Sequence, residues 1–154
     1  MTNIDPPAAP LEAHLGFWLR FVSNHVSARF RQRVEEEGTT VTEWVALRAL
    51  YDRPLTTHSA LIQALGMTKG AVSKVASRLE NKGLVRRQPV PDRPREQALS
   101  LTRKGRALVP KLATLADENE AHFFGHLPVS ERQQLAKTLQ ELVARHGFKE
   151  VPTA

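Results

Sequence analysis

The chain contains no cysteine among its 154 residues, and this absence excludes several kinds of chemistry. Without a thiol there can be no disulfide bond, no thiolate zinc site and no cysteine-based redox sensor. Aromatic residues are scarce as well, at 6%. No apolar run approaches the roughly 20 residues that a membrane-spanning helix needs. The composition therefore predicts a globular protein without a membrane segment.

Signals for secretion and for catalysis are also missing. Residues 1–10 are polar and proline-rich, and they lack the basic start and apolar stretch of a signal peptide. We expect this segment to be a flexible arm and the protein to stay in the cytoplasm. The sequence has no glycine-rich phosphate loop and no close carboxylate–histidine set, so we expect neither an enzyme nor a bound cofactor.

The positive charge of the chain is concentrated in one segment. The formal net charge is +6, and residues 68–106 contain 11 basic and 3 acidic side chains, which gives that segment +8 and leaves −2 for the rest. One basic segment on a near-neutral scaffold is expected of a protein that binds a polyanion. The alternative is a surface of lysine and arginine whose only role is solubility.

The two ends of the chain have the periodicity of long amphipathic helices. Apolar residues at three- and four-residue spacing predict a helix over about 11–37, ended by Gly38. This helix has two apolar edges, which predicts that it packs against a second partner as well as its own domain. Further helices are expected over about 102–125 and from Pro128 to about 146, followed by a frayed tail at 147–154.

The centre of the chain predicts two short helices joined by a tight turn. An earlier helix is expected over 43–51, with Thr42 as its N-cap. The first helix of the pair covers about 57–65, and Gly66 ends it. Thr68 is then the N-cap of a helix that runs to about Lys82. Such a pair has the pattern of a helix-turn-helix.

After this pair the periodicity changes from 3.6 to 2. A strand is expected over 84–90, a turn over 91–94 and a returning strand over 96–101. A helix-turn-helix followed by a β-hairpin is a winged helix-turn-helix. The predicted fold is therefore mostly α with a small β-hairpin wing, and with long helices at both ends.

The helix over 68–82 has two faces of different chemistry. Its apolar side is predicted to be buried through Val72, Val75, Ala76 and Leu79. The opposite side carries small or basic residues and no acid, namely Lys69, Gly70, Ser73, Lys74 and Ser77. Small residues let a helix approach base edges in the major groove, and lysine can bind guanine or phosphate. An ordinary solvent-exposed amphipathic helix remains the alternative.

Four arginines belong to the predicted hairpin. Arg86 and Arg87 lie near its start, and Arg93 and Arg95 lie at its tip beside two prolines. Arginines on a stiff turn are suited to a minor groove or to phosphate. The alternative is a charged hairpin that stays soluble through its edge residues.

Three runs of residues together resemble the MarR family of regulators. They are Leu-Gly-Met-Thr at 65–68, Leu-Glu-Asn-Lys-Gly-Leu-Val-Arg-Arg at 79–87, and Leu-Ser-Leu-Thr-Arg-Lys-Gly at 99–105. The resemblance extends over about 11–146. It implies a single domain over that range, with a winged helix-turn-helix at about 42–101 and dimerisation helices at about 11–37 and 102–146.

The resemblance also implies DNA-binding positions. It matches the recognition helix to Thr68–Lys82, with Lys74 at a position that commonly contacts DNA, and it places the wing arginine at Arg95. The family has aspartate where this chain has Arg93, and the aspartate here is Asp92. Either arginine therefore remains a candidate for the wing tip. The full set of DNA-binding candidates is Thr68, Lys69, Gly70, Ser73, Lys74, Ser77, Arg78, Arg86, Arg87, Arg93 and Arg95.

An effector site and a metal site are further hypotheses. Members of the family often bind small aromatic acids, and candidate lining residues lie on the first and second helices, namely Trp18, Phe21, His25, Trp44 and Arg48. Core and dimer packing is the alternative for these residues. His122 and His126 have the i, i+4 spacing of a metal pair, but histidines near a helix end are commoner, so no metal is predicted.

These observations predict a sequence-specific DNA-binding transcriptional regulator. We expect a homodimeric repressor that binds a pseudo-palindromic operator in double-stranded DNA and is released by a small, anionic aromatic ligand. Two alternatives remain: a winged-helix protein–protein module without DNA binding, and a metal-responsive regulator.

Overall fold

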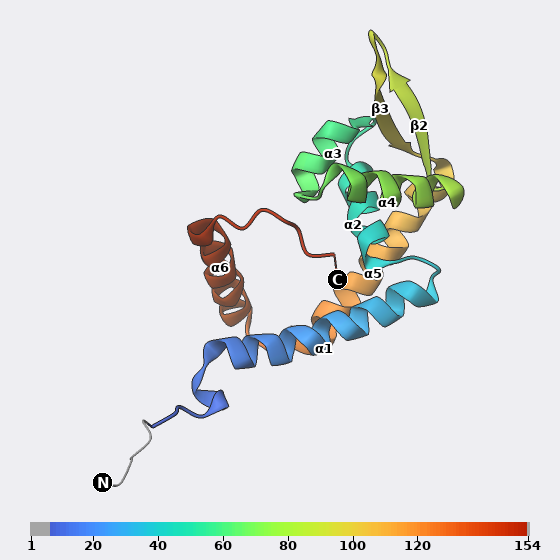
Figure 1. Ribbon diagram of the computed structural model, residues 1–154. Coiled ribbons are helices and arrows are strands. Elements are labelled where there is room, and N and C mark those ends of the chain that lie inside the picture. The colour runs from blue at the N-terminus through green and yellow to red at the C-terminus, as the bar shows by residue number, and fades with distance from the viewer. Residues whose placement is uncertain (1–6, 154) are drawn as a thin grey trace.

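The structure is a computed structural model that describes residues 7–153 (Figure 1). Along these residues the elements are η1 (Leu11–Ala13), α1 (Leu15–Glu36), α2 (Val41–Tyr51), β1 (Thr56–Thr57), α3 (His58–Leu65), α4 (Lys69–Asn81), β2 (Val85–Val90), β3 (Arg93–Leu101), α5 (Arg103–Phe124) and α6 (Val129–His146). The predicted fold class is confirmed, because a mostly α chain carries a helix-turn-helix followed by a β wing.

The core lies in one lobe made by α2 to α5 and the sheet. Each of these helices buries the apolar face that its periodicity predicts. Six leucines of this lobe are exposed by no more than 2%, namely Leu47, Leu50, Leu61, Leu79, Leu99 and Leu112. Full burial of each such side chain stabilises the lobe by about 1.5–3 kcal/mol. The lobe is therefore a rigid base for α4 and the wing.

Helices α1 and α6 lie largely outside this lobe (Figure 1). The only buried residue of α1 is Val34, at its C-terminal end, and α6 has none among its described residues. The second half of α1 is held on α5, since Arg29 donates to Asn119 Oδ1 at 3.0 Å and Asn119 donates to the carbonyl of Val26 at 3.2 Å. The first half of α1 and the whole of α6 thus leave apolar side chains uncovered in a single chain.

The sheet has a third strand that the sequence did not predict. Its order is β1-β3-β2, and β1 pairs antiparallel with β3 through Thr56 opposite Leu99. A strand of two residues is too short to show a period of 2, so only the fold reveals it. This pairing attaches the start of α3 to the base of the wing.

Three predicted boundaries were wrong. The first long helix begins at Leu15 rather than at about residue 11, because Leu11–Ala13 form the separate short helix η1 and His14 is extended. The N-cap of α2 is Thr40 rather than Thr42, because Thr40 Oγ1 accepts a hydrogen bond from the Glu43 amide at 3.1 Å and α2 begins at Val41. The wing turn is shorter than the predicted 91–94, since Val90 pairs with Arg93. Only Pro91 and Asp92 remain in the turn, and Asp92 adopts a φ of 66°, which aspartate tolerates better than most residues.

The two terminal segments differ in their contacts. The predicted arm at 1–10 falls outside the described residues for its first six positions. The tail after Gly147 was predicted to be frayed, but it contacts α3 and α2. The Val151 amide donates to the carbonyl of Leu65 at 3.0 Å, and Thr42 Oγ1 donates to the carbonyl of Thr153 at 3.3 Å.

Among the helices within residues 7–153, none is both long enough and apolar enough to cross a lipid bilayer.

Candidate nucleic-acid interface

Helix α4 is set in place by its cap, its turn and its buried face. Thr68 Oγ1 accepts a hydrogen bond from the Ala71 amide at 3.1 Å, which satisfies one of the free amides at the helix start. Gly66 allows the sharp turn before it with a φ of 63°, a conformation that favours glycine. Val72, Val75 and Leu79 are at most 3% exposed. The predicted buried face of this helix is therefore confirmed.

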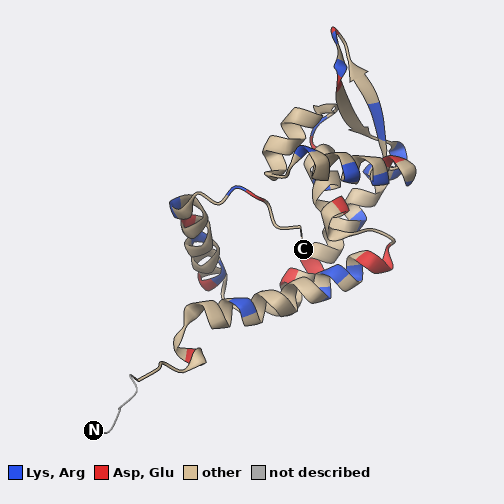
Figure 2. Cartoon of the chain, in the orientation of Figure 1, with Lys and Arg blue, Asp and Glu red and all other residues tan. Residues whose placement is uncertain are grey.

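The opposite face of α4 points to solvent and carries no acid over its first eleven residues. Lys69, Gly70, Lys74 and Ser77 are exposed, whereas Ser73 is only half-exposed. Figure 2 shows basic residues on α4 and along the wing, and it shows acidic residues at the end of α1 and on α5. The face thus offers positive charge and small side chains to a polyanion.

Not all of the basic residues of this segment belong to that face. Lys82 donates to both carboxylate oxygens of Glu43, at 2.9 and 2.7 Å, and to the carbonyl of Gly38 at 2.8 Å. Lys104 donates to the carbonyl of Lys82 at 3.0 Å. These lysines hold the lobe together, so the net charge of the segment overstates what is available for DNA.

Two arginines at the edges of the interface also make internal contacts. Arg78 lies 4.0 Å from the buried carboxylate of Glu43. Arg106 donates to the carbonyl of Tyr51 at 3.2 Å and lies over the Tyr51 ring, 5.3 Å from its centroid. Arg78 remains half-exposed, and its contact with DNA stays a prediction. Arg106 was not among the DNA-binding candidates.

The base of the wing is anchored to α4. Arg86 is exposed on β2, while Arg87 is half-buried and donates to Ser77 Oγ at 3.2 Å. Arg87 therefore points toward the recognition helix rather than along the hairpin edge. The two arginines, which the sequence did not distinguish, occupy different surroundings.

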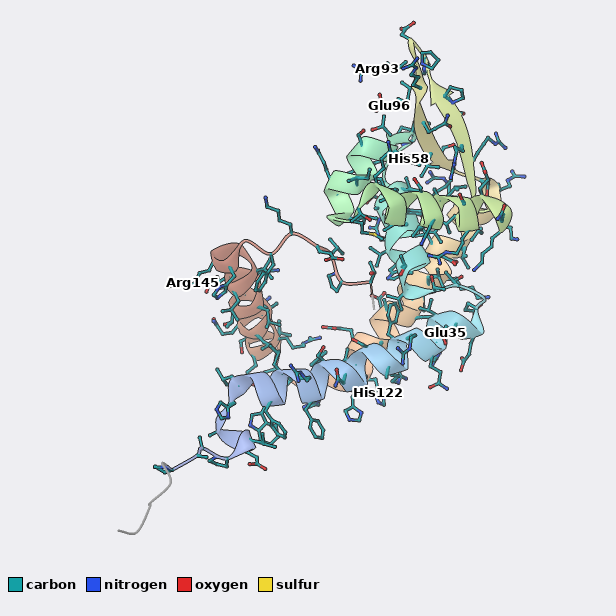
Figure 3. All side chains as sticks on the ribbon, in the orientation of Figure 1. Glu35, His58, Arg93, Glu96, His122 and Arg145 are labelled. Carbon is teal, nitrogen blue, oxygen red and sulfur yellow. The ribbon has the colours of Figure 1, made fainter. Side chains whose placement is uncertain are left out.

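The tip of the wing contains a bulge. The register passes from Pro89 opposite Gln97 directly to Val90 opposite Arg93, so Pro94, Arg95 and Glu96 have no partner on β2. A bulge redirects the side chains that it contains. Arg93 pairs with Glu96 at 3.3 Å (Figure 3), whereas the ion pairs of the described chain do not include Arg95.

The candidate effector residues do not meet around one cavity in the single chain. Trp18 and Phe21 are half-exposed on α1, and Phe21 lies 5.4 Å from the His25 ring. Trp44 instead packs against Phe30, at 6.4 Å between ring centroids. Arg48 forms an ion pair with Asp52 at 2.9 Å. The predicted cavity between the first and second helices is therefore not formed by these residues of one chain, and their role in binding an effector stays a prediction.

The predicted histidine pair lies far from the interface. His122 is exposed near the end of α5 (Figure 3), and its ring packs on Phe123 at 4.8 Å. Within residues 7–153, no group of three or more potential ligands is arranged to hold a metal ion.

His58 lies at the interface but is not among the DNA-binding candidates, although its place at the start of a short helix predicts a phosphate contact or a capping role. His58 is the first residue of α3, beside the base of the wing (Figure 3). Burial, together with the nearby charges of Arg87 and Lys69, lowers the pKa of His58 below its ordinary value of 6.5. His58, Lys69 and Arg87 lie on α3, α4 and β2, so their proximity depends on the packing of these three elements and not on a sequence pattern.

Comparison with known proteins finds relatives along most of the chain. The family model described as the MarR family matches residues 37–96. The transcriptional regulator HosA of Escherichia coli O111:H- is 26% identical over 125 residues, which cover 81% of this chain and 91% of HosA. The transcriptional repressor NicR of Pseudomonas putida is 26% identical over 145 residues, which cover 90% of this chain and 92% of NicR.

Comparison with a solved structure shows that the similarity includes the fold. The structure concerns the regulation of DNA binding of Bordetella bronchiseptica BpsR by 6-hydroxynicotinic acid. It matches this chain with a TM-score of 0.78 at 25% identity, and it covers 88% of this chain and 97% of BpsR.

Proposed function

We propose that this chain is a transcriptional regulator of the MarR family that binds double-stranded DNA as a homodimer. The observation that carries the proposal is α4: one face is buried in the lobe, and the other is basic, small and free of acid until Glu80. The B-DNA major groove, about 12 Å wide, admits one such helix. The wing beside it supplies further arginines.

The uncovered apolar faces of α1 and α6 support the homodimer. Leu15 on α1 is 87% exposed, and the predicted stripe on α6 is 38–47% exposed, at Leu135, Leu139, Leu142 and Val143. Apolar surface of this extent is typical of an interface. A two-fold dimer presents two copies of α4, so the operator should be a pseudo-palindrome with half-sites about one helical turn apart.

We assign DNA contact to the predicted set on α4 and the wing. Lys74 supports this assignment best, since it is exposed at the middle of the acid-free face and has no ion pair within residues 7–153. Thr68 acts in addition as the N-cap of α4.

Selection of bound genomic fragments would identify the operator. Lys74→Ala should then weaken operator binding about tenfold or more, which corresponds to about 1.4 kcal/mol, without lowering the melting temperature. The control Lys137→Ala removes a lysine from α6, which stands away from the lobe (Figure 1), and should bind as the parent does. Affinity should also fall steeply as salt rises, because phosphate contacts release counterions.

The second function class is a winged-helix protein–protein module. If no DNA fragment is enriched, and if the affinity for DNA is the same for the parent and for Lys74→Ala, the DNA-binding proposal is wrong and the module is favoured.

We further propose that a small aromatic acid weakens DNA binding and so releases a repressor. Phe17 and Phe21 line a hollow of about 410 Å³ at the start of α1 together with Arg20, which can pair with a carboxylate. The candidate residues Trp18 and His25 are on the same half of α1. A ligand there would lie beside the proposed dimer surface, where it can change the spacing of the two recognition helices. Preferential binding to the DNA-incompatible spacing by about 1–3 kcal/mol is sufficient.

Titration of benzoates, phenols and 6-hydroxynicotinic acid against the protein–operator complex would test this release. An active compound should raise the apparent Kd for DNA, and Arg20→Gln should reduce that response while leaving DNA binding intact. If no compound changes the affinity for DNA or the melting temperature at millimolar concentration, the effector proposal is wrong and the DNA-binding proposal is unaffected.

A further inference from the structure

Buried polar atoms without a protein partner gather where the wing joins the helix-turn-helix. Within residues 7–153, His58 Nε2 on α3 and Arg87 Nε on β2 are both buried and make no hydrogen bond. Thr56 Oγ1 on β1 is a third such atom, and Thr56 and Arg87 are both opposite Leu99 of β3. Residues paired across neighbouring strands project on the same side of a sheet. An unsatisfied buried group costs about 1–3 kcal/mol, so such a cluster is unfavourable for the protein alone.

The same place carries positive charge without a compensating carboxylate. Arg87 and Lys69 are both close enough to His58 to disfavour its protonation, after the larger effect of burial. Residues 56–65, which form β1 and α3, contain no acid. The nearest acid along β3 is Glu96, which pairs with Arg93. Among the ion pairs of residues 7–153, none includes Arg87 or Lys69. An anion is the group that would satisfy all three side chains together.

The orientation of Arg87 directs this cluster toward the proposed DNA surface. Its Nη2 donates to Ser77 Oγ on the exposed face of α4. Lys69 is the first residue of α4 and is exposed. A backbone phosphate bordering the groove that receives α4 would therefore lie next to Lys69 and Arg87, whose charges act on His58.

We propose that His58, Lys69 and Arg87 together bind one phosphate of the DNA backbone in each subunit, and that His58 takes up a proton when this phosphate binds. The inference rests on the proposed function, since it takes DNA as the polyanion. Phosphate oxygens accept hydrogen bonds from the imidazole, ammonium and guanidinium groups, and charge assistance strengthens these bonds. Phosphate contacts are independent of sequence, so every duplex offers one.

The sign of the pH effect follows from the two states of His58. In the free protein the pKa of His58 is below 6.5, so the imidazole is neutral at neutral pH. A bound phosphate attracts the protonated form and raises the pKa. Affinity for DNA therefore increases as the pH falls through the higher, bound-state pKa, and it becomes constant below the lower, free-state pKa. One linked proton changes the affinity by at most about tenfold per pH unit.

The test measures Kd for a labelled, mixed-sequence duplex of roughly 30 base pairs, which spans two half-sites. Ionic strength is constant, and the pH runs from about 8 to about 6, where histidine titrates. The parent should bind at least about fivefold more tightly at the lower pH. His58→Gln keeps a side-chain N–H donor but cannot take up a proton, so it should bind DNA with little pH dependence. The control His122→Gln changes a histidine at the far end of α5 (Figure 3) and should keep the parent's pH dependence.

A second measurement follows the protonation of His58 directly. The NMR titration of its ring proton should give a pKa below 6.5 in the free protein and a higher one in the DNA complex. Arg87→Gln should raise the pKa in the free protein and reduce the increase on DNA binding. A His58 pKa that is equal in both states would overturn the inference.

The binding outcomes separate this inference from the proposed function. DNA binding by the parent with an affinity independent of pH, or pH dependence that survives in His58→Gln, would overturn the phosphate site alone. Absence of DNA binding at every pH would overturn the proposed function and this inference with it.

Discussion

At the scale of single residues, Glu43 joins three parts of the lobe. Its carboxylate on α2 is 1% exposed and accepts two hydrogen bonds from Lys82 at the end of α4. The same ammonium group binds the carbonyl of Gly38, in the loop after α1. A buried carboxylate is tolerated only when it is paired and hydrogen-bonded. This interaction therefore helps to set the position of α4, and Lys82 is a residue of the scaffold.

Glu43→Gln should destabilise the protein by about 1–3 kcal/mol, because the buried side chain at position 43 loses its charge-assisted hydrogen bonds with Lys82. Urea denaturation followed by circular dichroism measures this free energy of unfolding. Glu35→Gln is the matched control, since Glu35 is exposed on α1 (Figure 3) and forms no ion pair within residues 7–153; its effect should stay within about 0.5 kcal/mol. Equal stability of the two variants would show that the Glu43 pair contributes little.

At the scale of elements, the wing differs from a regular hairpin. Its turn contains two residues, and the bulge at 94–96 lies on the β3 side next to that turn. Arg95 is in the middle of the bulge, while the guanidinium of Arg93 is held by Glu96. An arginine without an intramolecular partner breaks no ion pair when it binds DNA, so less binding free energy is lost. The geometry therefore favours Arg95 as the stronger contact.

Arg95→Ala should accordingly weaken DNA binding more than Arg93→Ala does. Loss of one phosphate or minor-groove contact should cost about 1–3 kcal/mol of binding free energy and reduce the slope of log K against log salt by about 1 per subunit. Fluorescence anisotropy at several salt concentrations measures both quantities. A larger loss for Arg93→Ala would mean that the Glu96 pair opens on binding and that Arg93 is the tip residue.

At the scale of the whole molecule, the lobe is complete and the helices outside it are not. The lobe buries its own core, but α6 has no buried residue and much of α1 is exposed on every side. These helices need another surface to cover their apolar side chains, and a second copy of the chain presents the same two helices. Dimerisation and DNA binding are then coupled, because the spacing of two α4 helices depends on how α1 and α6 pack.

Leu142→Glu should convert the dimer to a monomer and lower operator affinity without unfolding the lobe. Leu142 is 43% exposed in the single chain, so a charge there disturbs the interface rather than the core. Analytical ultracentrifugation measures the mass, and circular dichroism checks the fold. The control Gln133→Glu adds the same charge nine residues away, on the opposite side of α6, and should remain dimeric. A dimeric Leu142→Glu protein would place the interface elsewhere.

The sequence by itself determined the order and the chemistry of the local elements. Helix α4, its Thr68 cap, its turn at Gly66 and its buried valines follow from residues within a few positions of one another, and all were predicted. The same holds for the acid-free basic face, because a helical period places side chains on a face without any knowledge of the rest of the fold. These local features were sufficient to predict a winged helix-turn-helix.

Only the tertiary structure decided which of the basic residues are free to meet DNA. Lys82 and Glu43 are 39 positions apart in the chain, and Arg87 approaches His58 only after β1 has paired with β3. The bulge that separates Arg93 from Arg95 likewise depends on how two strands are paired. Contacts of this kind produce no periodic pattern in the sequence, because they depend on how whole elements pack against one another. The candidate effector residues are the extreme case, since Phe21 and Trp44 pack against different neighbours in the single chain although the sequence suggested one cavity.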